Sequence, residues 1–338
     1  MTRSRLSPVR PALALGPLVL LAACSGDSLP TQPPSFGSAA PAETQTADYV
    51  ANSWATKAAM PTARRGLVTA TVNGIVYAIG GRGANEVNLS TLEAFDPAGI
   101  LIYAWGSRAS LPAPRAWSSG AATINGKIYV PGGLNANANP TRTLYMYRPG
   151  TNSWVTKAQM PVASYGGASV AINGKLYVLT PTANSTLLHR YDPASNTWTS
   201  RATGPQGHWY PVAGVIDGKI YVAGTMHGDE SPSPVVSVYD PATNTWSGKA
   251  SMPEDQIGAG GVAIGGKLYA VGGFYTLNAQ SRLALHAYNP ATNTWAEKAH
   301  LPGSPRGFLS AAAANGVLYA LGGLNPPDVL KTNQAYYP

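Results

Sequence analysis

Charged residues and cysteine are both scarce in this chain. Asp, Glu, Lys and Arg make up 11% of its 338 residues, whereas an average globular domain carries about 25%. So little charge excludes a coiled coil or a disordered polyelectrolyte for most of the chain. The one cysteine is Cys24, so we expect no disulfide, no cysteine nucleophile and no cysteine-based metal site beyond it. A Gly-x-Ser-x-Gly nucleophile elbow is also absent.

Glycine and proline, by contrast, are abundant. The chain has 37 glycines and 29 prolines without the three-residue period of collagen, which is too many helix breakers for an α-helical protein. Many short strands joined by tight turns remain as the arrangement that fits, so the predicted fold class is all-β. A single β-rich domain can reach this length and bury a large core.

The N-terminus has the features of a secretory signal peptide. Arg3, Arg5 and Arg10 precede an apolar run over residues 12–23. That run is well short of the roughly 20 residues that a membrane-spanning helix needs, and a basic lead followed by a short apolar run is typical of an export signal. We therefore predict a signal peptide over residues 1–23 and an exported protein.

The end of this signal resembles the lipobox of bacterial lipoproteins. The residues that carry the resemblance are Leu21, Ala22, Ala23 and Cys24. The resemblance implies that Cys24 is lipidated as the first residue of the mature chain. In such lipoproteins of diderm bacteria, Ser25 after the cysteine implies anchoring in the outer membrane. The alternative is an ordinary secreted protein in which Cys24 is only an apolar residue.

The residues that follow Cys24 predict a flexible segment. Residues 24–47 are mostly Ser, Pro, Thr, Gln and Ala, with almost no large apolar side chain. Such a segment cannot bury enough surface to offset the entropy lost on ordering. We therefore predict a tether over residues 24–47 and a folded domain over residues 48–338.

One pattern recurs about every 50 residues through the rest of the chain. Each copy has a tryptophan, a base three residues later and a proline seven residues later, then a two-residue turn such as Asn73-Gly74 and a tyrosine three residues after the turn glycine, as at Tyr77. Asn-Gly is a favoured turn in tight β-hairpins. A double glycine, as at Gly80-Gly81, ends the second strand in four of the copies. The tryptophans are Trp54, Trp105, Trp154, Trp198, Trp246 and Trp295.

The double glycine and the spaced Tyr and Trp resemble the kelch repeat. The resemblance implies six four-stranded antiparallel blades that close around an axis, a six-bladed β-propeller. A parallel β-solenoid is the alternative, although its coils are much shorter than 50 residues. The last copy stops after a third strand, at Tyr336-Tyr337, while residues 50–60 precede any first strand. We therefore predict that this N-terminal segment completes the sixth blade as its outer strand and removes two open sheet edges.

The basic charge of the chain is spread over the repeats. The formal net charge is +8 and the isoelectric point is near 9.5, which raises the possibility of a nucleic-acid partner. Of the 20 bases outside the signal peptide, six follow the repeat tryptophans and four follow the turns, so half of them are distributed around the repeats. A ring of single charges does not form a continuous track for phosphates. We therefore expect no nucleic-acid partner.

Function is expected where the copies differ. The connections between blades and the loops between second and third strands lie at one end of the propeller, which we call the crossover face. We expect a rim rich in arginine there, opposite a rim with Asp229, Glu230, Glu254 and Asp255. Aligning the copies on their turns places Arg65, Trp117, Tyr165, Trp209, Ile257 and Gly307 at equivalent positions beside the axis. The candidate ligand-binding residues are Arg64, Arg65, Arg82, Arg115, Trp117, Tyr165, His208, Trp209, Glu254, Asp255, Arg306 and Phe308.

These residue types suit an anionic ligand. Guanidinium groups bind carboxylate, sulfate or phosphate, and aromatic rings stack on sugars. The leading hypothesis is a monomeric, envelope-anchored binding module for an anionic glycan or an acidic peptide or protein, with no cofactor. The alternative is that these are ordinary loop residues on a solvated face.

Two enzyme classes with kelch propellers provide further alternatives. Galactose-oxidase-like proteins need a tyrosine cross-linked to a cysteine beside copper, and no cysteine follows Cys24, so that activity is excluded. The six-bladed sialic acid mutarotases are similar in blade number and export, which implies an acid or base such as Glu254, Asp255 or His208 near the arginines. No catalytic motif matches residue by residue, so catalysis stays open. A metal set of His208, His227 and Asp229 has weak spacing evidence, and no metal is expected.

Overall fold

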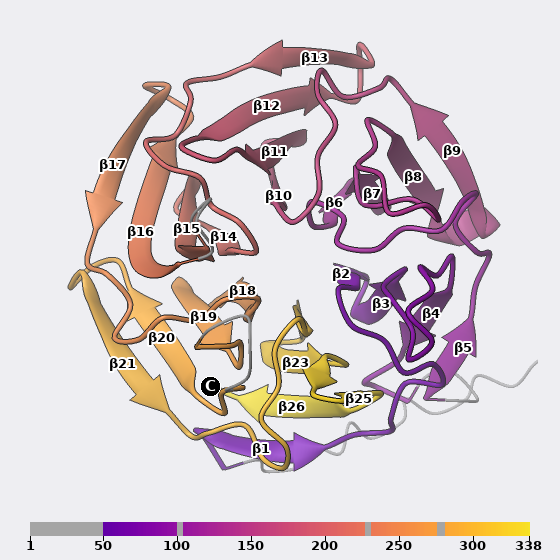
Figure 1. The fold of residues 1–338 in the computed structure, drawn as a ribbon, viewed down its shortest axis with the longest axis vertical. Coiled ribbons are helices and arrows are strands. Elements are labelled where there is room, and N and C mark those ends of the chain that lie inside the picture. Colours follow the sequence, from indigo (N-terminus) through magenta and orange to yellow (C-terminus); the bar gives the residue numbers. More distant parts are fainter. Residues whose placement is uncertain (1–49, 100–103, 227–230, 276–280) are drawn as a thin grey trace, which may run out of the picture. The chain divides into compact units, whose positions relative to one another are not determined.

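A computed structural model describes residues 50–99, 104–226, 231–275 and 281–338. The predicted signal peptide, Cys24 and the predicted tether lie outside the described residues, as do His227, Asp229 and Glu230. Residues 48–338 form one compact unit. In this unit, six four-stranded antiparallel sheets stand around a central axis (Figure 1). The prediction of an all-β, six-bladed propeller is confirmed.

The first three blades follow the chain from the axis outwards. Blade 1 contains β2 (Val68–Val72), β3 (Ile75–Ile79), β4 (Leu92–Phe95) and β5 (Trp105–Ser107). Blade 2 contains β6 (Ala122–Ile124), β7 (Lys127–Pro131), β8 (Leu144–Arg148) and β9 (Ser153–Lys157), with a 3-10 turn, η1 (Pro149–Thr151), before β9. Blade 3 contains β10 (Ala168–Ile172), β11 (Lys175–Pro181), β12 (Thr186–Asp192) and β13 (Thr197–Ser200).

The last three blades continue this order, and the sixth is built from both ends of the domain. Blade 4 contains β14 (Val212–Ile216), β15 (Lys219–Met226), β16 (Pro232–Asp240) and β17 (Thr245–Lys249). Blade 5 contains β18 (Gly260–Ile264), β19 (Lys267–Val271), β20 (Leu285–Asn289) and β21 (Thr294–Lys298). Blade 6 contains β22 (Ser310–Ala314), β23 (Val317–Leu321), β26 (Asn333–Tyr337) and β1 (Ser53–Thr56). A short hairpin of β24 (Leu324–Asn325) and β25 (Asp328–Val329) follows β23.

The N-terminal strand closes the ring as predicted. Strand β1 pairs antiparallel with β26, with Trp54 opposite Tyr336, and Figure 1 shows the indigo β1 beside the yellow β26.

The two-residue turns fit the hairpins that they join, because both residues of each turn have positive φ, as at Asn73 (49°) and Gly74 (78°). That conformation belongs to the type I′ turn.

Each repeat tryptophan joins its blade to the preceding one. The indole Nε1 of Trp105, for example, donates a 2.7 Å hydrogen bond to the carbonyl oxygen of Ala58, which follows β1. The other five tryptophans donate in the same way, at 2.7–3.0 Å. At the closure, Trp54 donates to Ala299 of the preceding blade, and Asn52 Oδ1 accepts from both the Ala299 N–H and the Tyr336 hydroxyl. The N-terminal segment therefore supplies a complete set of inter-blade contacts.

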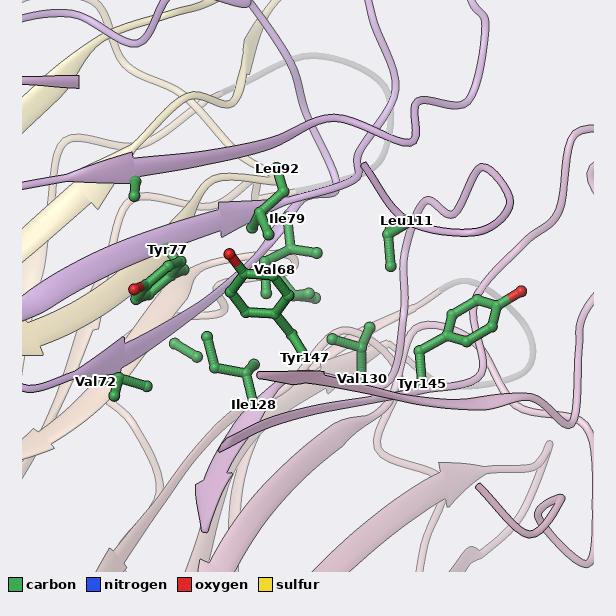
Figure 2. Packing of buried hydrophobic residues seen from close by; sticks show 12 residues of the cluster. Val68, Val72, Tyr77, Ile79, Leu92, Leu111, Ile128, Val130, Tyr145 and Tyr147 are labelled. Carbon is green, nitrogen blue, oxygen red and sulfur yellow. The ribbon is translucent and has the colours of Figure 1, made fainter. Parts of the chain in front are cut away.

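Six hydrophobic clusters fill the spaces between neighbouring blades. Figure 2 shows the cluster between blades 1 and 2, where Val68 and Leu92 of blade 1 face Ile128 and Tyr147 of blade 2. The repeat tyrosines are part of these clusters, so their period reports packing between sheets and not a series of ligand sites.

Each blade also buries one polar residue of its crossover. In four of these residues the backbone carbonyl accepts a hydrogen bond from the second glycine of the preceding blade, as Arg115 does from Gly81. Their exposed fractions are all 5% or less. The six are Arg64, Arg115, Ser164, His208, Gln256 and Arg306.

One of these six forms an ion pair within the described residues. Arg64 Nη2 lies 2.7 Å from Glu93 Oε2 on β4, and Arg64 also donates to the carbonyls of Ala78, Gly80 and Thr91. Burial lowers the pKa of Arg64 to about 10, while the Glu93 carboxylate opposes this shift. Removing either side chain would therefore leave the other one buried without its counter-charge.

We predict that deleting residues 48–61 lowers the melting temperature by at least about 10 °C. The deletion removes the outer strand of blade 6 and uncovers two hydrophobic clusters, and in a domain of this size each kcal/mol corresponds to about 2–4 °C. Asn52→Gly, which keeps the positive φ of 57° and removes the two side-chain hydrogen bonds, should cost about 1–3 kcal/mol. Calorimetry of both variants measures this, and a deletion variant that melts with the parent would disprove closure through β1.

We also predict that Glu93→Leu lowers the free energy of unfolding by about 3–5 kcal/mol, because it leaves the Arg64 guanidinium buried without its counter-charge. The double variant Arg64→Met, Glu93→Leu replaces the pair by apolar groups and should recover most of that loss. Urea unfolding of the two variants provides the comparison. A double variant as unstable as the single one would show that the ion pair is not the source of the effect.

Candidate functional site

The six crossovers meet in a closed ring of backbone hydrogen bonds around the axis. In each crossover one N–H donates to the carbonyl of the equivalent residue in the preceding blade, at 2.6–3.3 Å. All six residues have positive φ, between 46° and 64°. The ring residues are Gly66, Trp117, Gly166, Tyr210, Gly258 and Phe308.

Glycine and aromatic residues alternate around this ring. A Cβ atom on Gly66 would lie 2.7 Å from the Trp117 ring, so the indole rests directly on the glycine backbone. Tyr210 lies on Gly166 and Phe308 on Gly258 in the same way. Left-handed backbone is unusual for bulky aromatic residues and is found where surrounding structure imposes it. The ring hydrogen bonds supply that constraint here.

The alignment of the copies on their turns was wrong in blade 2. Trp117 is equivalent to Gly66 and not to Arg65, whose counterpart is Ala116. Blade 2 has one more residue than the others between its ring residue and its turn. The extra residue lies around Gly120, whose N–H donates to the Ser118 carbonyl just before β6.

The inner strands of all six blades line a central channel of about 450 Å³ below this ring. Most lining residues are Ala, Gly, Val, Ser or Thr, and none is Asp, Glu, Lys, Arg or His. The channel therefore offers no charged group for binding or acid–base chemistry. Charges occur instead on the crossover face beside the ring.

Arg65 and Arg82 form the main cationic site on this face. They lie opposite each other in an antiparallel bridge, with backbone N–H···O distances of 3.0 and 2.8 Å. Arg65 Nη2 donates to both carboxylate oxygens of Glu86, at 2.7 and 2.6 Å, and Arg82 Nη1 lies 3.5 Å from Oε2. The Arg82 guanidinium lies 4.5 Å from the centroid of Trp117, and that of Arg65 lies 5.9 Å away. Glu86 was not among the predicted site residues.

Aromatic residues continue from this site around the ring. Phe308 contacts both Trp117 and Tyr210, with ring centroids 6.2 and 5.3 Å apart. Trp209 lies between Tyr210 and Tyr165, at 6.3 and 5.0 Å. The structure thus brings the predicted residues Trp117, Tyr165, Trp209 and Phe308 together, and adds Tyr210.

Four predicted residues lie inside the blades. Arg64 is the buried partner of Glu93. Arg115 donates to Thr143 and Tyr145, and burial lowers its pKa. Arg306 is 1% exposed, without a carboxylate partner among the described residues, and burial lowers its pKa to about 10.

His208 is the fourth of these residues. It is fully buried, with Nε2 3.1 Å from the hydroxyl of Ser237 on β16 and Nδ1 3.4 Å from the Gly224 carbonyl. All four of these side chains therefore lie away from the surface that a ligand would approach.

The predicted acidic rim is represented by Glu254 and Asp255, both half-buried at the start of blade 5. Glu254 lies 2.7 Å from Arg282, whose guanidinium in turn lies 4.9 Å from the Tyr275 centroid. Glu254 is therefore engaged by a cation of its own blade.

The described residues show neither a cluster of metal-binding side chains nor a membrane-spanning helix. Across residues 50–99, 104–226, 231–275 and 281–338, no three His, Cys, Asp or Glu side chains gather as a metal site would require. Within those same ranges, there is no helix with the length and apolar character needed to cross a bilayer.

Comparison with known proteins identifies the repeats. Models of the kelch motif match residues 63–99, 118–161, 210–253 and 262–302. An F-box/kelch-repeat protein of Arabidopsis thaliana is 37% identical over 108 residues, which are 32% of this chain and 28% of that protein. Kelch-like protein 35 of Mus musculus is 29% identical over 132 residues, 39% of this chain and 21% of that protein. The chain thus spans less than a third of the length of these relatives.

A solved structure resembles the whole propeller. The structure of YjhT superposes with a TM-score of 0.68 at 18% identity and covers 81% of this chain and 95% of that chain. At this identity the likeness concerns the fold alone. Together, the four motif matches, the six blades and the closure through β1 identify this chain as a kelch-repeat six-bladed β-propeller.

Proposed function

We propose that this propeller is a binding module that recognises an anionic group at the crossover face, on the site formed by Arg65, Arg82 and Trp117. The ligand would be an acidic glycan or an acidic segment of a peptide or protein. Two guanidinium groups beside an indole suit both the charge and a flat neighbouring group.

The observation that carries this proposal is a difference between equivalent positions. The bridge that joins Arg65 and Arg82 in blade 1 joins Ala116 and Leu134 in blade 2, Ile257 and Phe274 in blade 5, and Gly307 and Leu324 in blade 6. Those pairs contain no charged side chain. Because three blades form the same bridge without charge, the scaffold does not require the two arginines. A charged pair that packing does not require is better explained by a ligand.

Binding without catalysis is favoured by the positions of the candidate acids and bases. A sugar epimerase of the mutarotase type would need one such group beside the arginine pair. His208 is fully buried in blade 4, and Glu254 is held by Arg282 in blade 5. Asp255 is half-buried next to Glu254 rather than in blade 1 with the arginines. Glu86, the carboxylate at the site, is itself engaged by both arginines.

The proposal includes the cellular location. We propose that the protein is exported, lipidated at Cys24 and held in the outer membrane by that lipid. The basic and apolar N-terminus and the lipobox-like Leu21 to Cys24 support this. The propeller would act as a monomer on a tether, without nucleic acid.

Replacing Arg65 and Arg82 by Ala should abolish selectivity for acidic ligands. The measurement is an array of acidic and neutral glycans and peptides probed with the full chain. A matched control is the double variant Lys127→Ala, Lys267→Ala. It removes the same amount of charge from the hairpin turns before β7 and β19, at the end of the propeller away from the crossover face. We expect binding to fall at least tenfold in the arginine variant and to be retained in the control. Equal losses in both variants would refute a site at Arg65 and Arg82.

Cys24→Ser should release the protein from the membrane. In a diderm bacterial host, the parent should sediment with membranes and incorporate labelled fatty acid, because the acyl chains anchor it. The variant should lose the label and leave the outer-membrane fraction, while Ser25→Ala, a neighbouring control, should stay lipidated. A Cys24→Ser variant that keeps the label would refute the anchor.

A further inference from the structure

Glu86 reaches the arginine pair from a tight turn in the loop between β3 and β4. Its N–H donates to the Gly83 carbonyl at 3.1 Å, and the Gly83 N–H donates to Val87 at 3.0 Å. Glu86 has a φ of 59°, a conformation that L-residues other than Asn and Asp seldom adopt. Its side chain turns back to Arg65 although 58% of it is exposed to solvent.

Blade 2 forms the same turn without a carboxylate. The N–H of Ala138 donates to the carbonyl of Asn135 at 3.0 Å, and the N–H of Asn135 donates to Asn139 at 3.0 Å. Ala138 has a φ of 58°, nearly that of Glu86. The backbone of this turn therefore needs no acidic side chain, and Glu86→Ala should leave it intact.

The two blades thus differ by three charged side chains placed on one backbone arrangement. Where blade 2 has Ala116, Leu134 and Ala138, blade 1 has two cations and one anion in mutual contact. We propose that Arg65 and Arg82 form a seat for a ligand carboxylate, and that Glu86 fills this seat in the free protein as an intramolecular competitor. This inference rests on the proposed function and names the ligand group.

The contacts of Glu86 define what the seat accepts. One planar carboxylate places both oxygens on Arg65 Nη2 and turns one of them towards Arg82 Nη1. Trp117 supports Arg82 through a contact at 4.5 Å that does not involve Glu86. A ligand carboxylate can therefore replace Glu86 while Arg82 keeps its aromatic support.

Glu86 is held weakly enough to be displaced. The Arg65 and Arg82 side chains are 16% and 19% exposed, and ion pairs open to solvent contribute about 0–1 kcal/mol. A side chain tethered beside its site has a local concentration in the millimolar range or above. Simple organic acids therefore compete poorly, and a ligand needs contacts beyond its carboxylate. Val87, which is 52% exposed beside Glu86, and the ring aromatics are available for them.

The test measures binding of a carboxylate sugar to the full chain with and without Glu86. The protein carries 5-fluorotryptophan, and the Trp117 signal is assigned by its loss in Trp117→Phe. Fluorine NMR titrations use glucuronate, with glucose and glucose 6-sulfate as neutral and tetrahedral-anion comparisons. We expect glucuronate to shift the Trp117 signal and to bind Glu86→Ala about fivefold more tightly than the parent, in line with the loss of one solvent-exposed ion pair.

Two variants control for charge and for the seat. Asp328→Ala removes an exposed carboxylate from the β24–β25 hairpin of blade 6 and changes the net charge equally, so it should leave glucuronate affinity within twofold of the parent. Adding Arg65→Ala and Arg82→Ala to Glu86→Ala should abolish the Trp117 shift. Glucose should cause no shift, and glucose 6-sulfate should gain less than glucuronate from the loss of Glu86.

Three outcomes would overturn the inference. Equal or weaker glucuronate binding by Glu86→Ala would show that Glu86 does not compete. Equal tightening by Asp328→Ala would attribute the effect to net charge. Equal gains for the sulfate and the carboxylate would refute the ligand group. None of these outcomes would refute the proposed function, which is tested separately by the array of glycans and peptides. The proposed function is refuted if binding in that array does not depend on Arg65 and Arg82.

Discussion

Closure of the ring is the constraint on which the rest of this structure depends. A four-stranded blade has two faces, and each face is buried only by a neighbouring blade. The six hydrophobic clusters each lie between two blades, so an incomplete blade would leave the clusters on both of its sides partly exposed. Pairing of β1 with β26, together with the hydrogen bonds between Trp54, Asn52 and Ala299, joins the two ends of the domain and completes blade 6.

The same constraint separates positions that packing determines from positions that can vary. Tryptophan, tyrosine and the turn residues recur because every blade needs the same contacts to its neighbours. The crossovers need the ring of backbone hydrogen bonds and one buried polar residue each, and their other side chains can vary where φ allows it. Gly66, Gly166 and Gly258 leave room there for three aromatic rings. The crossover face can therefore carry a site without loss of packing.

The fold could be predicted from the sequence because each periodic residue reports a packing requirement, and the pairing of β1 with β26 followed from counting strands. The site could be predicted only in part. Crossover residues alternate in direction, so Arg64 points into blade 1 while its neighbour Arg65 reaches the surface. The sequence alone does not show which of the two adjacent arginines points inwards. The extra residue near Gly120 likewise shifted the alignment of Trp117. Glu86 could have been found by comparing the loops over residues 82–88 and 134–140.

A carboxylate inside an anion site has two opposite effects. Two guanidinium groups that face each other repel, and an acid between them holds both in a fixed arrangement, which favours binding through preorganisation. The same acid must leave before a ligand carboxylate can enter. In this site Arg82 is also supported by Trp117 at 4.5 Å, and Arg65 is tied to Arg82 through the backbone bridge. Because these contacts do not involve Glu86, we expect competition to outweigh preorganisation, so that the proposed seat binds a ligand best when Glu86 has moved away.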